Sequence, residues 1–99
     1  MAGVQFDIKR VVFDYDVGKN IFVKERCGFG FEDAIEAIRS GRLLDIIEHP
    51  NKKKYLHQYV LVIEMENYVF SLPSVYDKDK NEFFLKTMYP SRKLTKEYL

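Results

Sequence analysis

The sequence predicts an α+β domain in which two helices of the N-terminal half pack on an antiparallel sheet that ends in a three-stranded meander. Two observations predict this class. Apolar residues recur at helical spacing between residues 31 and 38, whereas residues 59–72 alternate between apolar and polar side chains, as half-buried strands do. At 99 residues the chain is long enough for a single core with little to spare, so residues 1–99 are interpreted as one domain.

The meander is the clearest element. Two apolar sets alternate along its first two strands: Tyr59, Leu61, Ile63 and Met65, then Tyr68, Phe70 and Leu72. A two-residue turn at Glu66-Asn67 places Met65 opposite Tyr68 and puts both sets on one face. Residues 83–89 supply the third strand, which Pro90 ends because proline has no amide donor. Pro73 conflicts with a middle strand, so either the strand bulges there or pairing on that side has already ended.

The preceding elements follow from caps and periodicity. Residues 4–15 are extended, but their apolar alternation changes parity, so Arg10 marks a turn, a bulge or a gap between two strands. Asp16 is a good N-cap for a first helix that Gly28 ends. A second helix carries its apolar stripe at positions 31, 34, 35 and 38 and closes at Gly41. We expect a short strand over residues 43–47, a loop over 49–54, and a last helix capped by Ser91.

Composition restricts the class of protein without identifying it. The net charge of +1 does not by itself indicate nucleic acid, and the single cysteine, Cys27, excludes an internal disulfide and fits a reducing compartment. No apolar run approaches the roughly 20 residues of a membrane span, and the N-terminus lacks an export signal, so we expect a cytoplasmic protein. No cluster of His, Cys and carboxylates has ligand spacing, so we expect no metal and no cofactor.

Several short motifs resemble those of the BrnT-type toxins. Phe13-Asp14-Tyr15-Asp16, Lys19, Gly28 and Phe31-Glu32-Asp33-Ala34 are similar to the start of that family, and Ser91-Arg92-Lys93, Thr95, Glu97 and Tyr98 are similar to its tail. The resemblance covers about residues 11–99. It implies a small RelE-like fold and a metal-independent ribonuclease toxin of a type II toxin–antitoxin system. Its partner would be a DNA-binding antitoxin, encoded beside it, that covers the active site.

Cleaving RNA without a metal requires a base for the 2′-hydroxyl, an acid for the leaving oxygen and cations for the phosphorane charge. We predict His57 as catalytic, because histidine is the residue type suited to acid–base chemistry near neutral pH and this one lies beside the basic loop. Arg92 would clamp a phosphate through two parallel hydrogen bonds. Six residues are expected to contact RNA through charge or stacking: Lys52, Lys53, Lys54, Tyr55, Lys86 and Lys93. Tyr59 is a further stacking candidate, and His49 is interpreted as a loop residue without a role.

A second hypothesis is a catalytically weak or inactive relative of the same fold that binds a protein or RNA. Leu56-His57-Gln58 stands where many members of the toxin family carry Glu-x-Arg, which favours this hypothesis, whereas the Ser-Arg-Lys tail favours the ribonuclease. The lysine loop and His57 also fit an ordinary solvated surface. If the basic stretches 52–54 and 86–96 meet in space, they would make a groove of one sign. A third hypothesis is an unrelated role, for which no residue argues.

Overall fold

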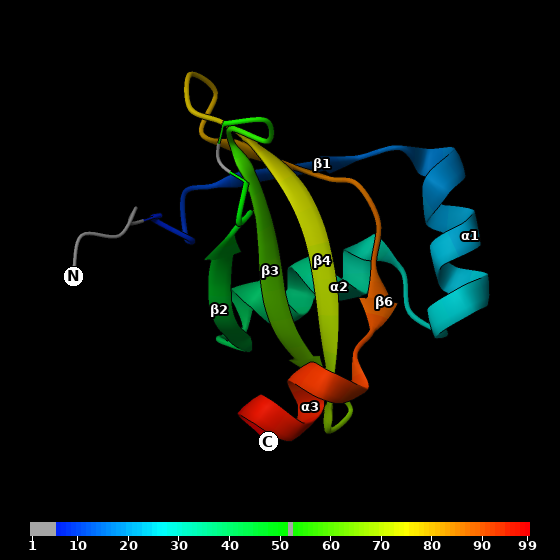
Figure 1. Ribbon diagram of the computed structural model, residues 1–99. Helices are drawn as coiled ribbons and strands as arrows, with labels where there is room; N and C mark the ends of the chain where they lie inside the picture. The colour runs from blue at the N-terminus through cyan, green and yellow to red at the C-terminus, as the bar shows by residue number, and fades with distance from the viewer. Residues whose placement is uncertain (1–5, 52) are drawn as a thin grey trace.

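Six strands form an open sheet in the computed structural model, which describes residues 6–51 and 53–99 and contains three helices in that part of the chain (Figure 1). The elements in chain order are β1 (Val12–Tyr15), α1 (Val17–Cys27), α2 (Phe31–Arg39), β2 (Leu43–Glu48), β3 (Gln58–Met65), β4 (Tyr68–Asp77), β5 (Glu82–Leu85), β6 (Tyr89–Pro90) and α3 (Arg92–Tyr98). Strands lie side by side in the order β1-β5-β4-β3-β2, and β6 also pairs with β4. The α+β class is therefore confirmed.

The predicted hairpin forms in the predicted register. Met65 pairs with Tyr68, Ile63 with Phe70 and Leu61 with Leu72, so both apolar sets face the core. The turn residues Glu66 and Asn67 have φ angles of 54° and 63°, the left-handed pair that a tight hairpin turn requires. Hydrophobic alternation therefore determined the pairing, although Glu-Asn is not the usual turn dipeptide.

Pro73 lies where the ladder on one side of β4 is interrupted. On the β3 side it pairs with Val60 without a bulge. On the other side β5 pairs with Ser74–Asp77 and β6 pairs with Phe70 and Ser71, which leaves Pro73 between the two. Its carbonyl accepts a hydrogen bond from the Lys86 amide (2.9 Å). The missing N–H of proline thus costs no ladder hydrogen bond, and the second of the two alternatives for Pro73 is correct.

The prediction of an antiparallel sheet with a third strand over residues 83–89 is wrong in two respects. The sheet is mixed, because β1 pairs parallel to β5, with Phe13 opposite Phe83 and Tyr15 opposite Leu85. The third strand also stops at Leu85, and residues 86–88 leave the sheet before β6. The physical reason is Met88, which is fully buried in the core cluster and whose carbonyl accepts from the Arg26 side chain. In a continuous strand, side chains alternate between the two faces, so with Phe83 and Leu85 in the core Met88 would point away from it.

Caps determine where the helices begin and end. The Asp16 carboxylate accepts from the Lys19 amide (2.7 Å), and Gly28, at φ 79°, terminates α1. The Asp33 carboxylate accepts from the Gly30 amide at the start of α2 (2.8 Å), and the Ser91 hydroxyl accepts from the Leu94 amide in α3 (3.1 Å). The strand predicted over residues 43–47 is β2. The parity change near Arg10 is a turn, because the Arg10 amide donates to the Asp7 carbonyl; Val4 and Gln5 lie outside the described residues.

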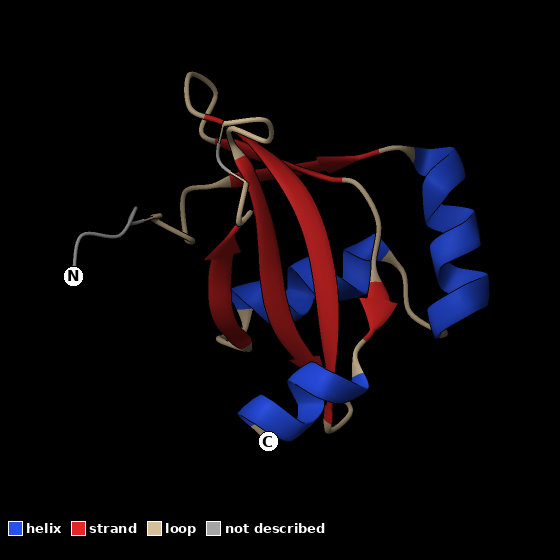
Figure 2. Ribbon diagram, in the orientation of Figure 1, coloured by secondary structure: helices blue, strands red, loops and turns tan. Residues whose placement is uncertain are grey.

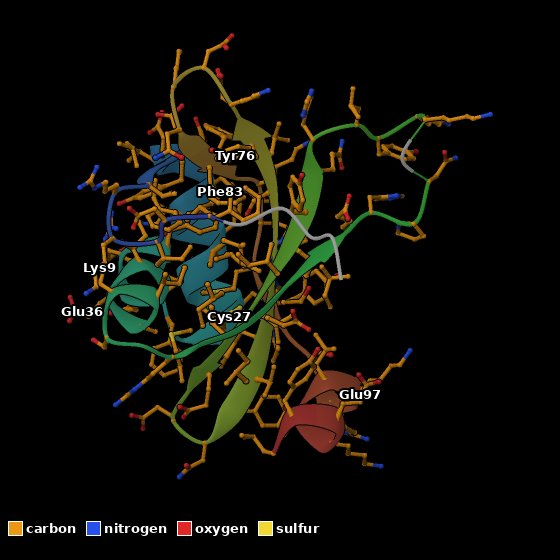
Figure 3. The ribbon with its side chains drawn as sticks, turned by 90° about the vertical axis from the view of Figure 1, so that its left-hand side faces the viewer. Lys9, Cys27, Glu36, Tyr76, Phe83 and Glu97 are labelled. Carbon is orange, nitrogen blue, oxygen red and sulfur yellow. The ribbon has the colours of Figure 1, made fainter. Side chains whose placement is uncertain are left out.

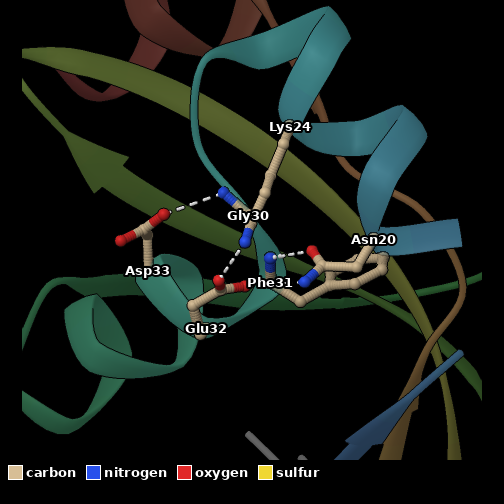
Figure 4. Close-up of polar contacts among 6 residues, drawn as sticks. All are labelled: Asn20, Lys24, Gly30, Phe31, Glu32 and Asp33. Carbon is tan, nitrogen blue, oxygen red and sulfur yellow. Dashed lines mark hydrogen bonds and ion pairs between the residues drawn. The ribbon is translucent and has the colours of Figure 1, made fainter. Parts of the chain in front are cut away.

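A polar network joins α1 to α2 (Figure 4). Asn20 is nearly buried; its side-chain oxygen accepts from the Phe31 amide and its nitrogen donates to the Glu32 carboxylate, both at 2.7 Å. Lys24 forms an ion pair with the same carboxylate. Gly30 approaches these side chains so closely that a Cβ would overlap Glu32 and Lys24. The connection between the helices is therefore held by side chains of both.

This network makes acid stability depend on Glu32. The hydrogen bond from Lys24, followed by that from Asn20, lowers the pKa of Glu32 from its usual 4.5 to about 2. A carboxylate with a depressed folded pKa contributes stability above its unfolded pKa and loses that contribution as pH falls through the folded value. We expect the wild type to lose more stability than Glu32→Gln between pH 5 and pH 2 in urea titrations. Parallel curves for the two proteins would contradict this linkage.

The helices divide between the two faces of the sheet. Figure 3 shows α1 and α2 on one side, and α3 together with the green segment that precedes β3 on the other. Residues on the α1 and α2 side form the main core, which includes Phe31, Leu61, Leu72 and Phe83. Figure 2 shows that the loops before β3 and after β4 gather at one end of the sheet, away from α3.

Candidate functional site

Helix α3 covers only one end of its face of the sheet. Val62 and Val69 lie under it and are fully buried, and the Val69 amide donates to the Thr95 hydroxyl (2.9 Å). The far end of α3 is held by a hydrogen bond from the Tyr98 hydroxyl to the Asp45 carboxylate (2.6 Å), which raises the pKa of Tyr98. The helix thus crosses from β4 to β2.

Beyond α3, no helix of the described residues covers the same face. Four of its residues, Val60, Pro73, Val75 and Phe84, keep part of their surface exposed, and we call this set the open face. They are neighbours, because Val60 pairs with Pro73 and Val75 pairs with Phe84. Phe84 is 38% exposed, while its neighbours Phe83 and Leu85 point into the core on the opposite side. A contiguous apolar surface therefore remains available at this end of the sheet.

A cavity of about 400 Å³ opens on this surface. Its lining comes from three separate parts of the chain: His49, Pro50, Gln58, Tyr59, Val60, Pro73 and Tyr89. Val60 and Pro73 belong to the open face, and Tyr89 is 44% exposed. The combination of apolar and aromatic lining with a few polar groups is typical of a small-ligand site.

His49 is held in a defined orientation at this cavity. Its ring packs on Tyr55 with 4.2 Å between the centroids, and its Nδ1 accepts from the Asn51 amide (3.1 Å). Because an amide can only donate, the neutral ring carries its proton on Nε2. Lys54 lies over the other ring of this stack, with Nζ 5.4 Å from the Tyr55 centroid. Lys54 therefore packs on the Tyr55 ring, which packs on the His49 ring, and His49 lines the cavity.

Lys86 provides positive charge on the other side of the cavity. It is exposed, it directly follows β5, and its amide bonds the carbonyl of the cavity residue Pro73. Lys54, in the loop before β3, and Lys86, directly after β5, thus lie next to cavity residues from two different segments of the chain. Of the residues predicted to contact RNA, the structure brings Lys54, Tyr55 and Lys86 to this region.

His57 and Arg92, predicted to act together, lie at opposite ends of the sheet. His57 precedes Gln58, which pairs with Val75 of β4, and the His57 carbonyl accepts from the Tyr76 amide. Arg92 follows Ser91, whose amide bonds the Val69 carbonyl. Val75 and Val69 are six residues apart on β4, roughly 20 Å at about 3.3 Å per residue. That span is too long for both side chains to contact one phosphate.

The other described cations predicted to contact RNA do not gather at the cavity. Lys53, Arg92 and Lys93 are exposed, and Lys52 lies outside the described residues. Of the two basic stretches, only Lys54 and Lys86 lie next to residues that line the cavity, whereas Arg92 and Lys93 lie at the other end of the sheet, beside Val69. Tyr59 packs against Phe6 and Phe83 in the aromatic core, and burial is the main cause of its raised pKa. Its ring is therefore not free to stack on a base.

Sequence reasoning missed His49, Gln58 and Tyr89 as site residues. They are separated by up to 40 positions (89 − 49) and share no motif, so only the pairing of β3, β4 and β6 brings them together. The signal that was available is His49 itself, a histidine directly after a strand and before a proline in a basic loop.

No family model, curated protein or solved structure matches this chain. Over residues 6–51 and 53–99, no group of three or more His, Cys, Asp or Glu side chains is arranged to hold a metal ion. No helix in the described part of the chain is long and apolar enough to cross a membrane.

Proposed function

We propose that this protein acts on single-stranded RNA through the open face, as a metal-independent ribonuclease toxin of a type II toxin–antitoxin pair. The observation that carries the proposal is the arrangement around the cavity, where Lys54 and Lys86 lie on different sides of an aromatic and apolar surface. Cations that follow a backbone, together with rings that accept bases, are the usual elements of single-strand binding. The motif resemblance to BrnT-type toxins and their RelE-like fold supplies the toxin class.

The chemistry assigned to this face differs from that expected for His57. With Nδ1 accepting from the Asn51 amide, His49, which lines the cavity, would donate a hydrogen bond from Nε2–H to a phosphate oxygen or to the leaving oxygen. Lys86 would stabilise the charge that develops on the phosphorane. A cognate DNA-binding antitoxin would restrain the toxin by covering this surface.

A second function is a non-catalytic RNA-binding module of the same fold. The separation of His57 from Arg92 favours it, because no described histidine shares a phosphate-sized space with Arg92. The nitrogen of His49 that would act as a base is already occupied by the Asn51 amide. Both functions use the same surface and differ in whether the RNA is cut.

Binding is expected to weaken several-fold in Lys86→Gln. Loss of one phosphate contact should also lower the slope of log K against log salt concentration by about 0.7 for a single strand. Fluorescence anisotropy with a short labelled RNA, titrated at several salt concentrations, measures both. The matched control is Lys9→Gln, because Lys9 is exposed on the α2 side of the sheet (Figure 3) and should leave affinity and slope unchanged.

Cleavage is tested in the same preparation by incubating the protein with total RNA and EDTA and resolving the products on a gel. Cleavage by the wild type that is lost in His49→Ala supports the toxin at this face. If cleavage is instead lost in His57→Ala and kept in His49→Ala, the catalytic histidine is His57. Binding without cleavage supports the second function, and a folded protein that neither binds nor cuts RNA overturns both.

A further inference from the structure

The cavity on the open face has the dimensions and the lining of a site for one nucleobase. Its volume of about 400 Å³ exceeds that of a single base, and Val60 and Pro73 give it apolar surface. His49 and Tyr89 contribute rings from two different segments, and Tyr89 is 44% exposed and thus available for stacking. A base enters such a space only when it is unstacked from its neighbours, as in a single strand.

Gln58 supplies the cavity with a side-chain amide on a fixed backbone. The backbone N–H of Gln58 donates to the Tyr55 carbonyl (3.2 Å), and the backbone carbonyl of Gln58 accepts from the His49 backbone amide (3.1 Å). Because both backbone groups are bonded, the Cα and the start of the side chain are held in place. Gln58 lines the cavity and keeps part of its surface exposed, so its side-chain amide is accessible to a ligand. A donor and an acceptor in one plane are therefore available to a ligand.

We propose that this cavity is a base-specific subsite that selects adenine, read by the side chain of Gln58. The inference rests on the proposed RNA-directed function and adds to it the substrate preference of the same face. A glutamine amide bonds both N6–H and N7 of adenine, whereas guanine offers two acceptors along that edge. Pyrimidines share less surface with Tyr89 and Pro73, so they lose stacking and apolar contact.

The positions of the cations fit this assignment. Lys54, over the Tyr55 ring that packs on His49, and Lys86, next to Pro73, lie on different sides of the cavity. The backbone of a strand whose central base enters the cavity would carry its flanking phosphates toward these two residues. Non-specific affinity then comes from the lysines, and base preference comes from Gln58.

The test uses the full chain and five labelled RNA oligonucleotides that are uridine-rich and differ only at the centre, which is A, G, C, U or abasic. Anisotropy is measured in EDTA at low salt. We expect the wild type to bind the adenine oligonucleotide about tenfold more tightly than the guanine one, and more tightly still than the abasic one. Gln58→Leu should lose the preference and keep the affinity for the abasic RNA, because it removes the amide without adding charge.

The outcomes separate this inference from the proposed function. Equal affinity of the wild type for all five RNAs overturns the adenine subsite while RNA binding stands. If the wild type prefers another base, the proposed hydrogen bonds between Gln58 and adenine are wrong. Absence of binding to every RNA overturns the proposed function, and the subsite with it. The wild-type series decides whether the cavity selects adenine. An adenine preference that persists in Gln58→Leu overturns the role of Gln58, and thermal melts establish that this variant folds.

Discussion

Replacing Phe83 by alanine is expected to lower the free energy of unfolding by about 3–5 kcal/mol, the range for removing a buried aromatic side chain. Phe83 has no exposed surface, and its ring contacts Phe6 at 5.0 Å and Tyr76 at 4.8 Å between centroids. It also lies in β5, which joins β1 to the rest of the sheet. Since small domains have a total stability of about 5–15 kcal/mol, this loss is a large share. Urea denaturation followed by circular dichroism measures it.

The neighbouring residue supplies the matched control. Phe84 is the same residue type in the same strand, but it is 38% exposed on the open face. Phe84→Ala should therefore cost about 1 kcal/mol, because less apolar area returns to water. If Phe84→Ala destabilised the protein as much as Phe83→Ala, the assignment of the two faces of β5 would be wrong. Phe84→Ala would also report on RNA affinity without the complication of unfolding.

Asn20→Ala is expected to destabilise the protein by about 2–3 kcal/mol. The Phe31 amide, buried at the start of α2, would lose its acceptor, and an unpaired buried donor costs about 1–3 kcal/mol. The hydrogen bond from Asn20 to Glu32 is lost as well. Because both bonds connect α1 to α2, thermal unfolding should begin at a lower temperature. Differential scanning calorimetry measures the shift.

Lys24→Ala provides the comparison within the same network. Lys24 binds the Glu32 carboxylate that Asn20 also contacts, but its side chain is half exposed. Exposed ion pairs contribute little, because water solvates the separated charges well. We expect a much smaller loss than in Asn20→Ala. A larger effect of Lys24→Ala would show that the ion pair, and not the buried amide, holds the junction.

The two faces of the sheet allow stability and function to be studied separately. The main core lies on the side of α1 and α2, and it includes Phe31, Leu61 and Phe83. Residues proposed to contact RNA, such as Gln58 and Lys86, lie on the other side or at its edge. Substitutions there should change affinity with little change in the free energy of unfolding.

The sequence by itself determined the local elements. Asp16, Gly28 and Ser91 predicted helix ends correctly, because caps act within one turn of chain. The hairpin register around Glu66-Asn67 was also predictable, since a period of two allows only one pairing that buries both apolar sets. These features depend on interactions between residues close in sequence.

Tertiary structure decided what depends on distant residues. Alternation along β1 does not encode a partner, so its parallel pairing with β5 followed from packing Phe13 against Phe83. Burial of Met88 ended β5 early and left Pro73 beside a break in the ladder. The same arrangement separated His57 from Arg92 and assembled the cavity from His49, Gln58 and Tyr89. A cavity is made by non-local pairing, and its residues carry no common spacing along the chain.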